Sequence, residues 1–221
     1  MTTLNIWIST LKQITLSLFT IVVLLLAVGA SFAAHAAGDP AAGKDQAAPC
    51  SACHGQDGAT GLDPTYPNLA GQNERYLFRQ LVMIQNGDRA IPLMAGQLNG
   101  KTEDQLRDLA AYYASLPAKV GQAEGDDEAI AQAAQIYRGG IARKGVAACA
   151  ACHNPNGLGN ALAGFPHLGG QPGAYTIAQL TAYRERARST DEEFGGMMRD
   201  IAEGLTDTEI ALLADYLQGL H

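Results

Sequence analysis

Two short stretches of this chain place a pair of cysteines directly before a histidine. The sequences CSACH and CAACH begin at residues 50 and 149, and together they use all four cysteines of the 221-residue chain. Two thiols at this spacing can each add to one vinyl group of a haem, and the next histidine then lies under the iron as an axial ligand. The motifs predict two haem c groups, attached through Cys50, Cys53, Cys149 and Cys152, with His54 and His153 as iron ligands.

Three other uses of a C-x-x-C pair remain open. A thioredoxin-like redox pair needs a βαβ context, which the sequence does not predict. A zinc site built from both pairs would have to join cysteines that lie on either side of a repeat boundary. A disulfide inside each pair would be strained as a structural staple. A redox pair would leave the histidine after both motifs unexplained, so covalent haem attachment is the favoured interpretation.

The chain repeats itself beyond these motifs. Cys50 and Cys149 are 99 residues apart, and YPNLAGQNERYLFRQL at 66–81 matches FPHLGGQPGAYTIAQL at 165–180 with the same offset. Self-similarity of this kind indicates two copies of one structural unit. We therefore expect the following division: a first domain at 37–118, a linker at 119–126, and a second domain at 127–221.

Methionine recurs where a second axial ligand is expected. After an insertion of five residues, 94–116 matches 198–220 at an offset of 104, which pairs Met94 with Met198. Thioether sulphur is a soft ligand that suits an electron-transfer haem, and a His/Met pair raises the reduction potential. Met94 and Met198 are the predicted sixth ligands, and Met197 remains a competitor of Met198.

The other candidate ligands fail the comparison between the repeats. His167 has Asn68 at its matching position, so we interpret it as an ordinary loop histidine, and His35 and His221 have no counterparts. Met83 lies inside a predicted helix face and is assigned to packing. With His and Met on both irons, no position is left open for oxygen, peroxide or substrate. The chain is therefore expected to be a carrier of single electrons and not an enzyme.

The elements that must position these residues are predicted to be helices. An opening helix follows Asp39 and has a counterpart at 127–138, and a middle helix runs from Asn73 to Gly87. The last helix of each unit begins with a capping box, whose first residues are Thr102 and Thr206. No alternating strand pattern is found. The expected fold class is all-α, with two tandem domains that each wrap around a haem because a unit this small lacks a sufficient core of its own.

The N-terminal residues 1–36 have the pattern of a secretory signal peptide. Lys12 is their only charged side chain, an apolar stretch follows at 14–32, and a small-residue cleavage site ends at Ala36. An uncleaved anchor is the alternative, because the apolar stretch is just long enough to span a bilayer. Either way the chain is expected to be exported. Its net charge of −7 and the absence of a basic run disfavour nucleic acid as a partner.

The repeated motifs resemble one known family. CSACHG…YPNLAGQ…YLFRQL…M followed by CAACHN…FPHLGGQ…Y…QL…MM is similar to the dihaem cytochromes c of the cytochrome c4 type over nearly all of 37–221. The resemblance implies two class I cytochrome c domains that face each other across a pseudo-twofold axis. It also implies a periplasmic protein that passes electrons from a quinol-oxidising donor complex to a haem–copper terminal oxidase, with peripheral membrane association.

The resemblance further implies roles for residues near the haems. The carbonyls of Pro67 and Pro166 would fix the orientation of the proximal imidazoles, with ordinary turn prolines as the alternative. Tyr76 and Tyr175 would pack near the haems or simply in the core. Arg89 would meet a haem propionate, although we expect it to be solvated, and its counterpart in the second unit is unassigned.

Two other functions remain open from the sequence. The chain resembles the dihaem subunits of flavocytochromes that oxidise sulphide, so it could serve a dehydrogenase complex. It could also be an enzyme in its own right, such as a dihaem peroxidase or a thiosulphate dehydrogenase. An enzyme would need a haem with a displaceable or unusual ligand.

Overall fold

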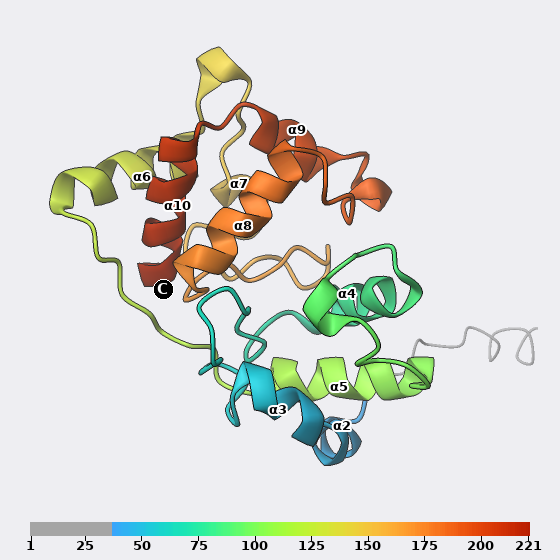
Figure 1. The fold of residues 1–221 in the computed structure, drawn as a ribbon. Coiled ribbons are helices and arrows are strands. Elements are labelled where there is room, and N and C mark those ends of the chain that lie inside the picture. Colours follow the sequence, from blue (N-terminus) through green and yellow to red (C-terminus); the bar gives the residue numbers. More distant parts are fainter. Residues whose placement is uncertain (1–36) are drawn as a thin grey trace, which may run out of the picture. The chain divides into compact units, whose positions relative to one another are not determined.

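The computed structural model describes residues 37–221, so the predicted signal peptide and its cleavage site after Ala36 lie outside the described residues. The first half of this region runs from α2 to α5 in Figure 1. Its helices are α2 (Pro40–Gln46), α3 (Ala48–His54), α4 (Glu74–Asn86) and α5 (Glu103–Ser115), with the 3-10 helix η1 (Pro92–Met94) between the last two.

The second half runs from α6 to α10. Its helices are α6 (Asp127–Gly139), α7 (Ala150–His153), α8 (Gly173–Arg184), α9 (Met197–Glu203) and α10 (Asp207–Gly219), with the 3-10 helices η2 (Ala142–Lys144) and η3 (Glu192–Phe194). Only two isolated β-bridges occur within 37–221, so the all-α prediction is confirmed there. In the same region, no helix is both long and apolar enough to cross a membrane.

Side-chain caps explain where several of these helices begin. The Asp39 carboxylate accepts a hydrogen bond from the Ala41 amide at the start of α2. The last helix of each half begins with the predicted reciprocal capping box, made by Thr102 and Gln105 in α5. Thr206 and Glu209 make the equivalent box in α10. These caps satisfy backbone donors that a helix N-terminus would otherwise leave unpaired.

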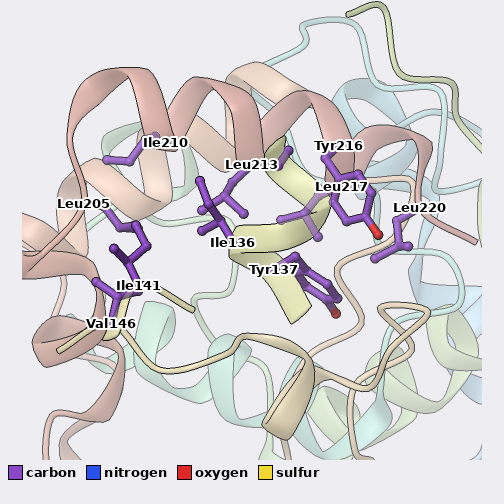
Figure 2. Close-up of a cluster of buried hydrophobic side chains, with 11 residues drawn as sticks. Ile136, Tyr137, Ile141, Val146, Leu205, Ile210, Leu213, Tyr216, Leu217 and Leu220 are labelled. Atoms are coloured by element: carbon purple, nitrogen blue, oxygen red, sulfur yellow. The ribbon is translucent and has the colours of Figure 1, made fainter. Parts of the chain in front are cut away.

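The last helix forms the centre of each half. In the first half α5 contacts α2 and α4, and in the second half α10 contacts α6 and α8. Figure 2 shows the core of the second half, where Leu213 and Leu217 of α10 face Ile136 and Tyr137 of α6. The first half has a smaller cluster of buried apolar residues, made by Ala47, Leu77, Leu109, Ala110 and Tyr113.

The repeated P-x-L-x-G-Q motif joins the two halves through its glutamines. The amide of Gln72 donates to the carbonyl of His167 (2.8 Å), and its oxygen accepts from the amide of the same residue (2.7 Å). Gln171 makes the same pair of hydrogen bonds to the backbone of Asn68, at 2.8 and 3.1 Å. This exchange of identical contacts is what a pseudo-twofold relation between the repeats requires.

The residue before the motif leucine adds a second reciprocal contact. Asn68 donates through its side-chain amide to the carbonyl of Gly170 (2.8 Å), and His167 donates through Nδ1 to the carbonyl of Gly71 (3.2 Å). His167 is therefore a loop residue, as expected, but it is buried and bonded to the other half. Asn68 and His167 occupy matching positions of the two repeats, and although the residue types differ, both side chains donate to a backbone carbonyl of the other half.

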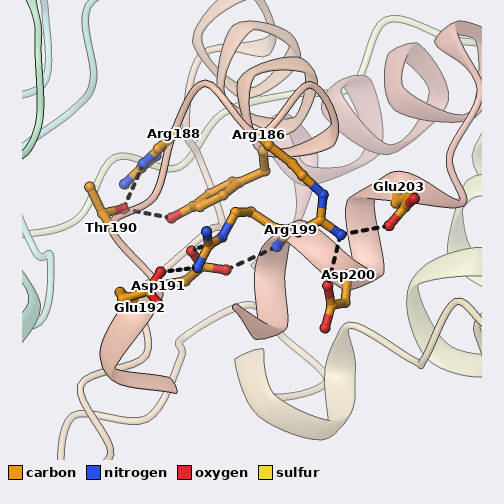
Figure 3. A network of polar contacts seen from close by, with 9 residues as sticks. Arg186, Arg188, Thr190, Asp191, Glu192, Arg199, Asp200 and Glu203 are labelled. Carbon is orange, nitrogen blue, oxygen red and sulfur yellow. Dashed lines mark hydrogen bonds and ion pairs between the residues drawn. The ribbon is translucent and has the colours of Figure 1, made fainter. Parts of the chain in front are cut away.

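The five-residue insertion of the second half follows Arg188. The backbone amides of Arg89 and Arg188 donate to Met83 and Ala182, at 2.9 and 3.0 Å, so the offset of 99 continues to this point. The segment after it is held by ion pairs, which Figure 3 shows between Asp191 and Arg199 and around Arg186. One member of the insertion region, Glu193 of η3, forms an ion pair with Arg79 of α4 in the first half.

Candidate functional site

One cavity of about 1210 Å³ collects nearly every residue that the motifs singled out. Both cysteine pairs, both motif histidines and both predicted methionines line it. Apolar side chains such as Leu77 and Leu109 from the first half and Leu213 and Leu217 from the second complete its walls. A large apolar hollow with a few convergent polar groups is the form of a site for a prosthetic group or ligand.

The cysteines lie on short helices that end at the motif histidines. Cys50 and Cys53 belong to α3, and Cys149 and Cys152 lie at the start and within α7. No disulfide joins these four cysteines, so each is available for thioether attachment. Residues three apart on a helix share a face, which brings both sulphurs of a pair to the same side.

Two observations bear on the redox and zinc alternatives. Burial raises the pKa of Cys149 to about 11, whereas a redox-active thiol needs a lowered pKa. Within 37–221, no three Cys, His, Asp or Glu side chains are arranged to hold a metal ion, which argues against a zinc site built from both pairs.

Each motif histidine is buried and oriented by a proline carbonyl. His54 and His153 are 7% and 6% exposed, and their Nδ1 atoms donate to Pro67 (3.1 Å) and Pro166 (3.0 Å). A bonded Nδ1–H leaves the lone pair of the imidazole on Nε2, where it can ligate a metal. Burial lowers the pKa of both histidines, with a smaller opposing effect of the proline carbonyls. The neutral, ligating form is therefore favoured.

The candidate methionines differ in their exposure. Met94 ends η1 and is half-buried, and Met198 in the first turn of α9 is half-buried as well. Met197 also lines the cavity but is 37% exposed, while Met83 is not among the lining residues. Met94 and Met198 therefore stay the predicted sixth ligands, with Met197 as a competitor of Met198.

Two arginines that the sequence did not place correctly also line the cavity. Arg89 is only 8% exposed, so the expectation that it is solvated is wrong. Arg188, which is 8% exposed too, is the counterpart that remained unassigned. The sequence could have identified this counterpart, because Arg188 lies 99 residues after Arg89, the offset of the repeat. The inserted segment that follows Arg188 made the alignment of the repeats ambiguous there. Both guanidiniums can be buried because tyrosine and glutamine side chains from the two halves accept their hydrogen bonds.

These arginines test whether the cavity fits a haem. Neither forms an ion pair with a carboxylate of residues 37–221, although buried cations normally require a partner. The buried Nε2 of Gln80 beside them has no hydrogen-bond acceptor either. A haem brings propionate carboxylates as well as an apolar ring, so its polar edge and its apolar body both find matching residues here.

The pKa of Tyr76 reflects the positive charge in this part of the cavity. Burial alone would raise the pKa of its phenol, but the charges of Arg188 and Arg89 lower it below the ordinary value. Tyr76 and Tyr175 both line the cavity, as expected for residues near a haem, and their hydroxyls accept hydrogen bonds from Arg188 and Arg89.

Comparisons with known proteins agree with this site. The cytochrome c family matches residues 40–117 and 130–221. Cytochrome c4 of Pseudomonas aeruginosa is 46% identical over 201 residues, which cover 91% of this chain and 98% of that protein. The crystal structure of reduced recombinant cytochrome c4 from Pseudomonas stutzeri aligns with a TM-score of 0.80 at 44% identity, over 84% of this chain and 100% of that one.

A more distant relative carries a different description. The thiosulfate dehydrogenase electron acceptor of Thiomonas intermedia is 35% identical over 184 residues, which cover 80% of this chain and 81% of that protein. Both relatives and the two family matches extend over the two repeats found in the sequence. The chain belongs to the cytochrome c family, as a dihaem electron carrier of the cytochrome c4 type with two covalently bound haem c groups.

Proposed function

We propose that this protein is a periplasmic carrier that takes single electrons from a quinol-oxidising complex and delivers them to a haem–copper terminal oxidase. The observation that carries the proposal is the pairing, in each half, of a buried, carbonyl-oriented histidine with a half-buried methionine on one cavity. Two protein ligands on an iron leave no position for a substrate, which suits electron transfer. The haem groups supply the one-electron chemistry.

The residue roles follow from the motifs and from this geometry. Cys50 and Cys53 attach the haem of the first domain, and Cys149 and Cys152 attach that of the second. His54 and Met94 would hold the iron in the first domain, and His153 and Met198 would hold it in the second. Pro67 and Pro166 orient the two imidazoles, and the apolar walls exclude water.

The division of the chain belongs to the same proposal. The domains occupy 37–118 and 127–221, with a linker at 119–126, in agreement with family matches that end at 117 and resume at 130. We propose that residues 1–36 direct export to the periplasm, where the carrier associates with the membrane surface.

A second candidate function is an electron acceptor for a dehydrogenase. The relative from Thiomonas intermedia is named for accepting electrons from thiosulfate dehydrogenase, and it resembles this chain over both repeats. Dihaem subunits of flavocytochromes would fall in the same class. In this case the protein is still a carrier, but its electrons come from a dehydrogenase instead of a quinol-oxidising complex.

The experiment compares donors and acceptors on the holoprotein. The reduced protein is mixed with membranes that contain a haem–copper oxidase, and its reoxidation is followed together with oxygen uptake. In a parallel arm, the oxidised protein is mixed with a thiosulfate dehydrogenase and thiosulfate, or with a quinol-oxidising complex and quinol. Reoxidation by the membranes and reduction by the quinol-oxidising complex support the first candidate. Reduction by the dehydrogenase alone favours the second, and consumption of thiosulfate or peroxide by the protein by itself would contradict both.

A further inference from the structure

Arg89 and Arg188 belong to one closed cluster that crosses between the halves. The side-chain oxygen of Gln80 accepts from Arg89 (2.9 Å) and from Arg188 (3.0 Å). The side-chain oxygen of Gln179 likewise accepts from Arg89 (3.1 Å) and from Arg188 (2.7 Å). Each glutamine therefore holds one arginine of its own half and one of the other half, and the two cations share both acceptors.

The tyrosines of the cluster are exchanged in the same way. Arg89 of the first half donates to the hydroxyl of Tyr175 in the second half (3.2 Å), and Arg188 of the second half donates to Tyr76 in the first (3.0 Å). Neither guanidinium is thus positioned by its own half alone. The cluster exists only when both halves are in place.

The charges of this cluster are not balanced by the polypeptide. Two buried guanidiniums that share acceptors repel each other, and the cost grows as water is excluded. The nearby acidic side chains are engaged elsewhere, since Asp191 pairs with Arg199 and Asp88 accepts from Asn86. The unpartnered Nε2 of Gln80 adds a further buried donor. The cluster therefore needs anions from outside the chain, and the cavity that it lines contains both haem attachment motifs.

We propose that Arg89 and Arg188 form one shared anion site for the carboxylates of both haem groups, so that each arginine sets the reduction potential of both haems. The inference deepens the proposed electron-transfer function. A buried positive charge stabilises the reduced form of a nearby iron, because reduction removes one positive charge from the metal. Because both arginines bond to Gln80 and Gln179, the two cations lie close together, and we expect each to act on the carboxylates of both haem groups.

The test is a potentiometric titration of the holoprotein and of two variants, Arg89→Met and Arg188→Met. Methionine keeps much of the side-chain length and removes the charge. We expect each single substitution to lower both reduction potentials. The expected change is about tenfold in each equilibrium in favour of the oxidised form, which is about 59 mV for a one-electron couple. If each variant moves only one step, the arginines serve separate sites and the proposal is overturned. It is also overturned if neither step moves.

A matched control separates this effect from a general change in charge. Arg107 pairs with Glu103 and Asp104 on the surface of α5, outside the cavity. Arg107→Met removes the same formal charge in a screened setting, so we expect less than about a twofold shift in either step. A shift as large as that of Arg89→Met would mean that net charge alone is responsible, which contradicts a local site.

Two gentler variants decide the question if the methionine variants fail to assemble. Arg89→Lys keeps the charge, so both steps are expected to stay near their wild-type positions. Tyr175→Phe removes only the hydroxyl that Arg89 reaches in the other half, and we expect both steps to shift by about threefold. A single moving step in Tyr175→Phe, or a tenfold shift in Arg89→Lys, would overturn the proposal. A wild-type protein without two one-electron steps would instead contradict the proposed function.

Discussion

The two halves place a buried tyrosine against the first motif cysteine from different helices. In the first half this is Tyr113 on the last helix, which packs in the cluster that contacts Cys50. In the second half it is Tyr137 on the opening helix, in the cluster that contacts Cys149, and its hydroxyl donates to the carbonyl of Asn154 (2.6 Å). A buried tyrosine therefore lies near the first motif cysteine in both halves, although different helices supply it.

The cores behind the sites differ more than the sites themselves. The second half buries the 13-residue helix α6 against α10, as Figure 2 shows, whereas the first half has the seven-residue helix α2 in its place. Its own buried apolar cluster is correspondingly small. We infer that the haem supplies a larger share of the core in the first half, which should be the less stable of the two.

Matched cavities in the two cores test this difference with the largest expected effect. Leu109 and Leu213 occupy equivalent positions in α5 and α10, and both are buried. Leu109→Ala and Leu213→Ala should each cost about 2–5 kcal/mol of unfolding free energy. We expect Leu109→Ala to unfold the first half in a separate, earlier transition of the holoprotein, and Leu213→Ala to shift a single joint transition. Denaturation followed by hydrogen exchange in α5 and α10 distinguishes these results, and the reverse order would refute the comparison.

The junction between the halves should respond symmetrically, because its contacts are reciprocal. Gln72→Ala and Gln171→Ala each leave a buried backbone donor and acceptor of the other half unpaired. We expect equal costs of about 1–3 kcal/mol, with faster hydrogen exchange in both halves. Gln85→Ala is the control, because the Gln85 amide bonds only to Leu98 and Lys101 of its own half. Gln85→Ala should speed hydrogen exchange in the first half alone. If Gln72→Ala also changed exchange in only one half, the prediction of a symmetric junction would be contradicted.

The capping boxes give a smaller contrast that depends on pH. Partial burial acts to raise the pKa of Glu209, but Lys144 and the Thr206 amide lower it below the ordinary value, whereas Gln105 in the first half does not titrate. A lowered pKa means that the stabilisation is present above the unfolded pKa of about 4.3 and is lost as the pH falls through the folded value.

The measurement for this contrast is the unfolding free energy of Glu209→Gln and wild type between pH 7 and pH 3. The wild type should be more stable by about 1 kcal/mol or less at neutral pH, and the difference should vanish in acid. Hydrogen exchange of α5 serves as the internal reference, since its box contains no ionisable group. A difference that grows as the pH falls would show that Glu209 is not stabilising in its charged form.

Much of this architecture could be read from short-range signals. The caps at Asp39, Thr102 and Thr206 and the stop at Gly87 are local choices of backbone and side chain, and the structure has helices at each of them. The bond from His54 to Pro67 follows from the family resemblance and not from the repeat itself.

The contacts between the halves could not be predicted in the same way. The burial of Arg89 depends on Tyr175 and Gln179, which are far away in the sequence and gain their meaning only when the repeats pack together. For the same reason His167 had no visible role before its bond to Gly71 was known. A repeat fixes which residues correspond, but not which of them meet.

The most direct test of one His/Met site in each half is the weak near-infrared absorption of sulphur–iron coordination in the holoprotein. If each half closes its iron with its own methionine, Met94→Ala and Met198→Ala should each remove about half of this band, and the double variant should remove all of it. Met197→Ala and Met83→Ala should leave it intact. A band that survives in the double variant, or that is halved by Met197→Ala, would contradict the assignment of one equivalent His/Met site to each half.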